Sequence, residues 1–345
     1  MNKDRLLESL EILSLEFGPS GCETPVADRI LELADGHYDS VERDCFGNII
    51  FKIASDSDRK PLMLSAHMDE VGFIITDIDE YGYLHFANIG GISNAVIAGR
   101  RVRVECTDGR LISGVISAKP VHLQTAKEKE TPTPPDELLI DIGATCRKEA
   151  SGLVSEGCYA TFDSEFVRLG ENEIKCKALD NRFGCAIGLE AMMSIWESGK
   201  RPPRDTYFAF TTREEIGYSG ALVAANRIRP EYAIILETTA MNDMPGVPEH
   251  LMNTVLGNGV CIGTVFDKEL FDLACRVAEE YGLKWQMRKY IAAGNDAVPI
   301  HKSTHGVKAL AIVAATRYLH SPSSVESVKD VFDCCELLKL MIERL

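Results

Sequence analysis

Two adjacent carboxylates, Glu214 and Glu215, stand where an apolar strand gives way to a glycine turn. The preceding run, residues 205–210, is rich in aromatic and β-branched side chains and is typical of a buried strand. Neighbouring side chains at a strand end point in different directions, so one carboxylate can bind a metal ion while the other handles a proton. Taken alone, the pair is better explained as a solvated acidic turn.

Four other residues of metal-ligand type follow apolar runs elsewhere in the chain. His67 follows residues 62–66, Asp180 follows 174–179, Glu237 follows 234–236, and His320 follows a strand that begins near residue 309. In an open parallel sheet, the carboxyl ends of the strands share one edge, where ligands bind. A core histidine, a helix cap or a loop charge would explain each residue singly. Together they predict one site built from five strand ends.

Imidazole combined with carboxylate favours zinc, cobalt or manganese over calcium, which takes more oxygen ligands. Two histidines and three carboxylates exceed what one catalytic zinc ion usually takes, so two ions that share a carboxylate fit better. Such a pair activates water and polarises a carbonyl group, and one further carboxylate can accept the water proton. Asp69, two residues beyond His67 on the same strand face, is expected to orient the His67 ring.

The segments that must position these residues alternate between helix and strand. Apolar stripes predict helices near residues 6–13, 24–33, 181–197, 268–281 and 325–345, and apolar runs predict strands at 49–53, 61–66, 205–212, 232–236 and 309–313. This alternation predicts an α/β fold. Its sheet should be mixed but largely parallel, with helices covering both faces.

Between residues 71 and 165 the pattern changes to short alternating strands separated by glycines. No amphipathic helix is expected among them, which predicts a small all-β barrel. At about 150 residues per domain, a chain of 345 residues suggests two domains. We therefore expect a discontinuous catalytic domain of residues 1–70 and 166–345, with the barrel inserted as residues 71–165.

The composition excludes several classes of protein. With 37 basic and 52 acidic residues, the net charge of −15 argues against nucleic acid as a partner. No apolar run predicts a membrane span and no signal peptide is recognised, so we expect a cytoplasmic protein without a membrane partner. The 11 cysteines form no Cys-x-x-Cys pair and are expected to be free thiols, most of them buried.

Four stretches together resemble one known family: residues 65–73, 177–182, 213–217 and 317–322. They contain Ser-Ala-His-Met-Asp-Glu-Val-Gly-Phe, Lys-Ala-Leu-Asp-Asn-Arg, Arg-Glu-Glu-Ile-Gly and Arg-Tyr-Leu-His-Ser-Pro, and the Gly-Asn-Asp-Ala stretch at 294–297 also matches in place. The chain is similar over nearly its whole length to the tetrahedral aminopeptidases. That family includes glutamyl, leucyl and lysyl aminopeptidases and sequences labelled as endoglucanases.

The resemblance implies a catalytic domain with two divalent metal ions, zinc, cobalt or manganese, and an inserted barrel that pairs subunits. The dimers of this family commonly assemble into tetrahedral dodecamers. His67 matches a ligand of one ion, and Asp180 matches the carboxylate that bridges both. Glu215 and His320 match ligands of the other ion.

Glu214 matches the general base of the family, and Asp69 matches the residue that orients the first histidine. Glu237 occupies the remaining ligand position. The family pattern has aspartate there, so the extra methylene of Glu237 changes the reach of its carboxylate.

The sequence thus predicts a metal-dependent aminopeptidase that acts on short peptides. One alternative is a related two-metal hydrolase of acylated amino acids or other amides, which the barrel and the Met68-Asp69-Glu70 continuation disfavour. Another is a non-catalytic homologue that keeps only the shell, which the complete set of ligand and base residues disfavours. A glycosidase would need two carboxylates flanking a sugar bond and no metal.

Overall fold

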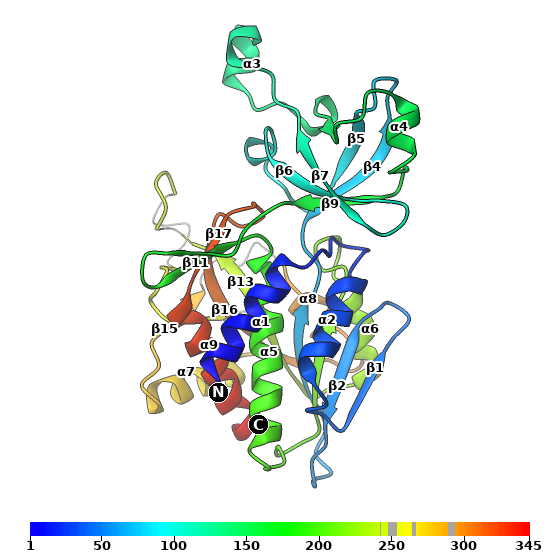
Figure 1. The fold of residues 1–345 in the computed structure, drawn as a ribbon. Coiled ribbons are helices and arrows are strands. Elements are labelled where there is room, and N and C mark those ends of the chain that lie inside the picture. The colour runs from blue at the N-terminus through cyan, green and yellow to red at the C-terminus, as the bar shows by residue number, and fades with distance from the viewer. Residues whose placement is uncertain (242, 248–253, 264–266, 289–293) are drawn as a thin grey trace.

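The structure is a computed structural model that describes residues 1–241, 243–247, 254–263, 267–288 and 294–345. A large sheet with helices on both faces lies below a separate barrel in Figure 1. The chain leaves the sheet after His67, builds the barrel, and returns to the sheet at Val167. Within the described ranges, no helix is both long and apolar enough to cross a membrane.

The centre of the large sheet is parallel, as the sequence predicts. Its four parallel neighbours are β12 (Thr206–Thr211), β3 (Leu62–His67), β13 (Tyr232–Ala240) and β16 (Lys308–Arg317). Antiparallel strands flank them: β1 (Ser40–Arg43) and β2 (Ile49–Ile53) on one side, and β17 (Ser324–Ser327), β11 (Glu173–Cys176) and β10 (Val167–Leu169) on the other. The remaining pair, β14 (Val260–Gly263) and β15 (Trp285–Arg288), also joins β16.

Alternation along the central strands sends successive side chains to opposite faces. Leu64 and Ile234 pack into the larger core, whereas Met63 and Ala233 pack into the smaller one. The larger core lies under α1 (Lys3–Leu15), α2 (Thr24–Ala34), α5 (Leu179–Glu197), α7 (Lys268–Glu280) and α9 (Val328–Arg344). The smaller core lies under α6 (Ser219–Ile228) and α8 (Ala297–Ile300). Both faces are therefore covered, which confirms the predicted fold class.

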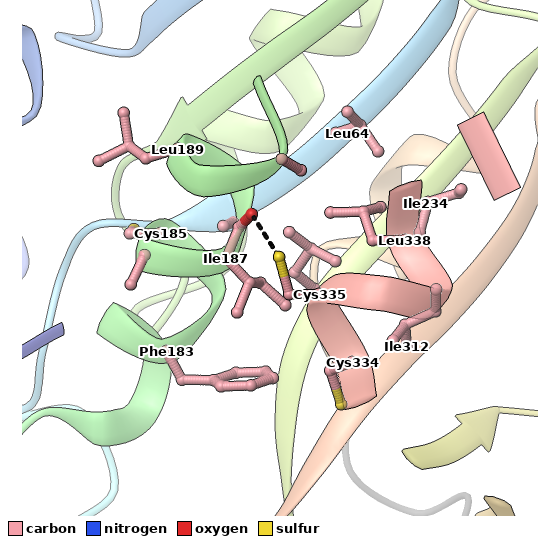
Figure 2. Close-up of a cluster of buried hydrophobic side chains, with 14 of the residues drawn as sticks. Leu64, Phe183, Cys185, Ile187, Leu189, Ile234, Ile312, Cys334, Cys335 and Leu338 are labelled. Carbon is pink, nitrogen blue, oxygen red and sulfur yellow. Dashed lines mark hydrogen bonds between the residues drawn. The ribbon is translucent and has the colours of Figure 1, made fainter. Parts of the chain in front are cut away.

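Helices α5 and α9 meet directly above the central strands (Figure 2). The Cys335 thiol donates to the carbonyl oxygen of Ile187 at 3.8 Å, and Leu338 packs in the same cluster. Cys185, Cys334 and Cys335 are buried and free, in line with the expectation of buried thiols. This packing holds α5, which begins beside Asp180, between α9 and the sheet.

The barrel closes in the order β4 (Gly72–Ile78), β5 (Leu84–Ile89), β8 (Ile140–Asp141), β7 (Leu111–Ile116), β6 (Arg101–Glu105) and β9 (Tyr159–Phe162). Phe73 packs edge-on against Phe86 and Phe162 inside it, at 5.1 and 5.2 Å between ring centroids. Short helices α3 (Ala126–Glu130) and α4 (Arg147–Ser151) and 3₁₀ turns at Asn94–Val96, Val121–Leu123 and Pro135–Glu137 connect the strands. The sequence reasoning did not anticipate these helices or β9.

A buried cation joins α1, α5 and the segment after β3. Arg182 is fully buried, and its guanidinium donates to the carbonyl oxygens of Leu13, of Met68 at 2.7 Å and of Gly18 at 3.3 Å. It also lies 3.5 Å from Glu70, whose carboxylate accepts a hydrogen bond from Lys177 at 2.5 Å. Backbone carbonyls that would otherwise be buried without donors are thus satisfied.

We expect Arg182→Met to lower the free energy of unfolding by about 3–5 kcal/mol, because it leaves buried carbonyl groups and part of the Glu70 charge without a partner. Arg276, exposed on α7, provides the matched control, and Arg276→Met should change stability by less than about 0.5 kcal/mol. Urea denaturation of the metal-free proteins measures both. Equal midpoints for the two variants would contradict this role for Arg182.

Candidate metal centre

Strand register brings the ends of β3 and β12 level with an inner residue of β13. Thr211, the last residue of β12, pairs with His67, the last residue of β3. Ile235 of β13 pairs with Ser65 of β3, so Glu237, two residues further on, is level with His67. Because β13 continues through two threonines to Ala240, Glu237 lies inside a strand and not beyond its end as the sequence suggested.

Asp180 and His320 reach the same place from outside the parallel strands. Asp180 lies at the beginning of α5, where its backbone (φ −82°, ψ 104°) is extended and not helical. His320 follows β16 in a turn with a φ of +56°, and its Nδ1 donates to the carbonyl oxygen of Gly91 in the barrel at 2.6 Å. That hydrogen bond fixes the ring and leaves Nε2 as the atom that faces the carboxylates.

The barrel makes a second close contact beside this ring. Gly90, with a φ of +78°, packs so tightly that an added Cβ would lie 2.8 Å from Val71 Cγ1 and 3.3 Å from Glu215 Cβ. Only glycine fits a position that combines this conformation with so close an approach.

Two groups of ligand-type atoms meet at Asp180. His67 Nε2 lies 3.3 Å from Asp180 Oδ1 and 3.6 Å from Glu237 Oε1. His320 Nε2 lies 3.4 Å from Asp180 Oδ2 and 3.2 Å from Glu215 Oε1. Within each group, the candidate ligand atoms all lie within 4.8 Å of one another. Asp180 therefore offers one oxygen to each group, the arrangement expected of a carboxylate that bridges two ions.

Unpaired oxygens support the same assignment. Asp180 Oδ1, Glu215 Oε1 and Glu237 Oε2 are buried and make no hydrogen bond to any described part of the chain, although imidazole nitrogens lie near the first two. Buried carboxylate oxygens without partners are costly. Ligands about 2.05 Å from a tetrahedral ion lie roughly 3.3 Å from one another, close to the nitrogen–oxygen separations seen here. The residues present thus fit divalent metal ions.

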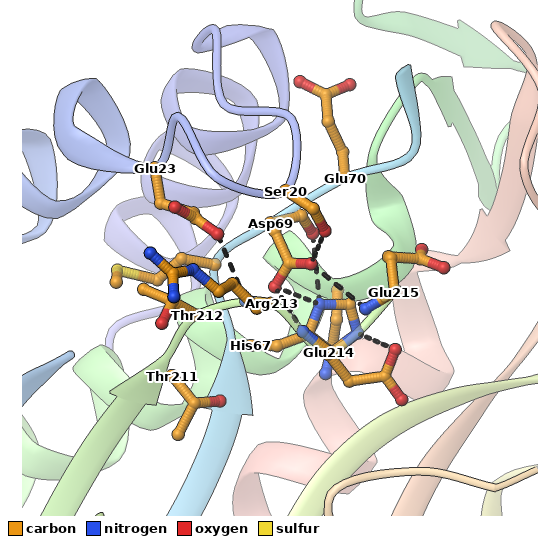
Figure 3. Close-up of polar contacts among 12 residues, drawn as sticks. Ser20, Glu23, His67, Asp69, Glu70, Thr211, Thr212, Arg213, Glu214 and Glu215 are labelled. Atoms are coloured by element: carbon orange, nitrogen blue, oxygen red, sulfur yellow. Dashed lines mark hydrogen bonds and ion pairs between the residues drawn. The ribbon is translucent and has the colours of Figure 1, made fainter. Parts of the chain in front are cut away.

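The Glu214–Glu215 turn is held by its backbone, which leaves both side chains free for the site (Figure 3). The amide groups of Glu214 and Glu215 donate to the two oxygens of the Asp69 carboxylate at 3.0 and 3.1 Å, and the Ser20 hydroxyl donates to it as well. Arg213 adopts a φ of +59°, and its amide donates to Glu23 at 3.1 Å.

Asp69 contacts His67 in two ways. His67 Nδ1 lies 3.1 Å from the main-chain oxygen of Asp69 and 3.5 Å from its carboxylate. Both oxygens of that carboxylate also accept amide hydrogen bonds from the acidic turn. The Asp69 side chain therefore links the end of β3 to the turn after β12, because it accepts hydrogen bonds from the backbone of that turn. The sequence predicted only its contact with His67.

Without an ion, the charges at the centre perturb one another strongly. Burial opposes a charge on His67, but Glu237 and Glu214 outweigh it and raise the pKa of the ring well above its usual value. Burial, reinforced by the charge of Asp180, raises the pKa of Glu237 to about 8. Burial also raises the pKa of Glu214, with contributions from Glu237 and Glu215. Such a set of competing acids is typical of a functional site.

The centre opens into a pocket of about 460 Å³. Asp180, Glu214, Glu215, Glu237 and His320 line one part of it, and Tyr218, Thr238 and Arg288 also contribute to the lining. His67 and Asp69 are not among the lining residues because they are almost completely buried. A substrate in the pocket would therefore meet the carboxylates and His320, while His67 supports them from behind.

Several residues at the centre were missed from the sequence. Ser20 and Glu23 hold the acidic turn, and Asp296 accepts hydrogen bonds from Ser65 at 2.9 Å and Thr211 at 2.6 Å, which ties β3 to β12. Arg288 lines the pocket from the end of β15. Only Asp296 had a sequence signal, because it lies in the 294–297 stretch that matched the resembling family. The others are remote from every predicted strand end.

Comparisons with known proteins find aminopeptidases both by sequence and by structure. A family model described as M42 glutamyl aminopeptidase matches residues 47–337. The lysyl aminopeptidase of Pyrococcus furiosus is 29% identical, with 95% of this chain and 94% of that protein aligned. A TET aminopeptidase from the sediment archaeon Thaumarchaeota archaeon SCGC AB-539-E09 superposes with a TM-score of 0.95 at 31% identity, covering 100% of this chain and 98% of the other. The Pyrococcus horikoshii TET1 peptidase is described as assembling into a tetrahedron or a large octahedral shell. It superposes with a TM-score of 0.89 at 29% identity, covering 99% of this chain and 100% of the other.

Proposed function

Because this chain belongs to the M42 glutamyl aminopeptidase family, we propose that it removes N-terminal residues from short peptides at a centre of two divalent metal ions. Membership makes the protein a peptide hydrolase. The observation that carries the two-metal proposal is Asp180, whose two oxygens face separate histidine–carboxylate groups at 3.3 and 3.4 Å. One ion would be held by His67, Asp180 and Glu237, and the other by Asp180, Glu215 and His320.

Zinc, cobalt and manganese suit this mixture of imidazole and carboxylate ligands. Bound ions of this kind would polarise the scissile carbonyl group and make a water molecule acidic enough to attack at neutral pH. The longer side chain of Glu237 suits its position inside β13, where Oε1 lies 3.6 Å from His67 Nε2. The family's shorter aspartate would reach less far from the same backbone position.

Glu214 is the residue best placed to move protons. Its carboxylate lines the pocket, and its nearest basic contact is His67 Nε2, 3.9 Å from Oε2, whereas Glu215 lies 3.2 Å from His320. We assign Glu214 to take the proton from the attacking water and deliver it to the leaving amine. Asp69 serves this step by fixing the Glu214 amide at 3.0 Å.

The direct test is hydrolysis of a panel of aminoacyl anilides by protein that has been stripped with a chelator and reloaded with zinc, cobalt or manganese. We expect turnover only after reloading. The matched N-acetyl anilides should not be cleaved, because an aminopeptidase needs the free amine. Equal turnover of acetylated and free substrates would identify a deacylase instead. No turnover with any of the three metals would show that the protein is a non-catalytic homologue.

Metal uptake should strengthen as the pH rises. Burial opposes protonation of His320, but the nearby carboxylates of Asp180 and Glu215 outweigh it and raise the pKa of the ring to about 11 in the metal-free protein. A metal ion must displace that proton, so apparent affinity should rise about tenfold per pH unit for each proton released. The same ion pair stabilises the metal-free fold fully below about pH 6.5 and progressively less as the pH approaches 11.

Calorimetric titration of the stripped protein with manganese between pH 6.5 and 8.5, in buffers of different ionisation enthalpy, measures both affinity and proton release. An affinity for manganese that stops rising above pH 7 would contradict the raised pKa of His320.

We also propose that residues 1–70 and 166–345 form the catalytic domain, and that the inserted domain of residues 71–165 pairs two subunits. Apolar side chains exposed on this insertion support pairing: Val115 at 48%, Val121 at 65% and Leu123 at 61% exposed. The tetrahedral assembly named for the Pyrococcus horikoshii relative, and the dodecamer named for the similar structure of PhTET1-12s, support a dodecamer of six such dimers. Light scattering should then give twelve times the 38.0 kDa mass of one chain.

A further inference from the structure

Strand β13 extends beyond its neighbour β3 at the metal centre. β3 pairs with it only as far as Ile235, whereas pairing with β16 on the other side continues to Ala240. Along residues 236–240, one edge of β13 is therefore not paired with β3, and this edge includes Glu237, one of the proposed ligands. A strand edge that a neighbouring strand does not occupy presents main-chain donors and acceptors that can pair with another extended chain.

The pocket follows this edge and not one face of the strand. Residues 237–240 are consecutive in β13, and all of them line the 460 Å³ pocket. Successive side chains of a strand point to opposite faces, so a pocket over one face would be lined by alternate residues. Lining by consecutive residues places the pocket along the edge, where main-chain groups are within reach of a bound molecule.

The main-chain groups of alternate residues identify what this edge offers. The Asn181 side chain donates to the carbonyl oxygen of Leu236 at 2.7 Å, and the amide group of Thr238 donates to Glu237 Oε1 at 2.9 Å. Alternate residues of a strand present their main-chain groups to the same edge, so the carbonyl group of Thr238 and the amide group of Ala240 lie on it too. In a parallel ladder, an acceptor and a donor with this spacing bind the amide and carbonyl groups of one residue of the added strand.

We infer that this edge of β13 binds the main chain of the peptide substrate as an added parallel strand, with the third residue of the peptide opposite Thr239. The inference rests on the proposed aminopeptidase function and specifies its substrate class as extended peptides of three or more residues. Because the contacts are made to main-chain groups, they do not depend on which side chain the first residue carries.

The position of the scissile bond sets the direction and register of the added strand. The carbonyl group of the first residue must lie at the ligand cluster, level with Glu237, where Glu214 can act. The rest of the peptide leads away from the cluster, as β13 does after Glu237, so the two chains run parallel. Since both advance about 3.3 Å per residue, the third residue comes level with Thr239. Its amide group then donates to the Thr238 carbonyl group, and its carbonyl group accepts from the Ala240 amide group.

The test compares three substrates that begin with the same residue X, the one whose anilide is hydrolysed fastest. They are X-amide, X-Ala-Ala-amide and an analogue of this tripeptide amide in which an ester replaces the amide bond between the second and third residues. In the metal-loaded wild-type protein, kcat/KM for release of X from the tripeptide amide should exceed that from X-amide by about thirtyfold, because two hydrogen bonds are added. The ester analogue lacks the amide group that faces Thr238 and should lose about tenfold.

Ala240→Pro makes the matching change on the protein, because proline has no amide hydrogen to donate. It should lower the preference for the tripeptide amide over X-amide about tenfold, and Ala240→Gly, which keeps the amide group, should retain that preference. Calorimetric binding to metal-loaded Glu214→Gln gives a readout that does not depend on turnover. There the tripeptide amide should bind about tenfold more tightly than its ester analogue.

Two outcomes would overturn the inference while leaving the proposed function intact. The first is a wild type that cleaves X-amide and the tripeptide amide with equal kcat/KM. The second is equal cleavage and equal binding of the tripeptide amide and its ester analogue, which would show that the third residue is not paired with β13. Failure to cleave any anilide or peptide with zinc, cobalt or manganese would instead contradict the aminopeptidase function itself.

Discussion

Replacing Glu214 with glutamine is expected to lower kcat on aminoacyl anilides by about three orders of magnitude while leaving two metal ions bound per chain. Glutamine has nearly the same shape but cannot accept the proton of the attacking water, and general bases typically contribute 10²- to 10⁴-fold. The Glu214 amide still donates to Asp69, so the turn should keep its conformation. KM should change little, because the lost interaction belongs to the transition state.

The adjacent residue supplies the matched control. Glu215→Gln makes the same chemical change one position along the chain, but Glu215 Oε1 lies 3.2 Å from His320 and is assigned to metal. That variant should lose metal measured by elemental analysis, and its activity should recover in part when excess metal is added. If Glu214→Gln lost metal and Glu215→Gln kept it, the two roles would have to be exchanged.

The second large effect is expected from Asp180→Asn, which should remove both ions and with them all measurable turnover. Its two oxygens serve the two ligand groups, so one substitution weakens both sites at once. Asparagine carries no charge and presents only one oxygen, and it cannot bridge two cations in the same way. Elemental analysis after dialysis should find far less than one ion per chain.

Asp205→Asn is a suitable control for that loss. Asp205 precedes β12, at the opposite end of the strand from the metal centre, and pairs with Lys52 at 2.5 Å. The control should retain both ions and wild-type turnover. Retention of two ions by Asp180→Asn would contradict a bridging role, and loss of only one would place Asp180 in a single site.

The sequence predicted the centre of the fold well because long apolar runs have few alternatives. The strands that end at His67 and Thr211 are buried on both faces, and their register follows from parallel pairing. The family resemblance and the inserted barrel are likewise confirmed. The antiparallel strands β10 and β17 were not predicted because each has only three or four residues, too few to show a period. The run at 174–179 was predicted as a strand that ends at Asp180, but β11 ends at Cys176 and α5 begins at Leu179.

The structure brings the predicted ligand-type residues together, but the residues that support them were not predicted. His67, Asp180, Glu215, Glu237 and His320 come together as expected because strand ends and the start of α5 share one edge. The hydrogen bonds that hold Asp69 to the acidic turn depend on backbone amides, which carry no sequence signal. Arg288 belongs to β15, which pairs with β14 at the side of the sheet. Its place in the pocket lining depends on tertiary packing, which the local sequence pattern does not predict.

The two glycines of the barrel that approach the metal centre change how the insertion should be regarded. Gly91 supplies the carbonyl group that orients His320, and Gly90 packs against Glu215. Two residues of the inserted domain therefore contact side chains that we propose as metal ligands. A rotation of the barrel relative to the sheet would reach a metal ligand through a single hydrogen bond. If the barrel pairs subunits as we propose, quaternary structure and metal affinity at the sheet edge should be linked, and a protein that lacks residues 71–165 should bind metal more weakly than the full chain.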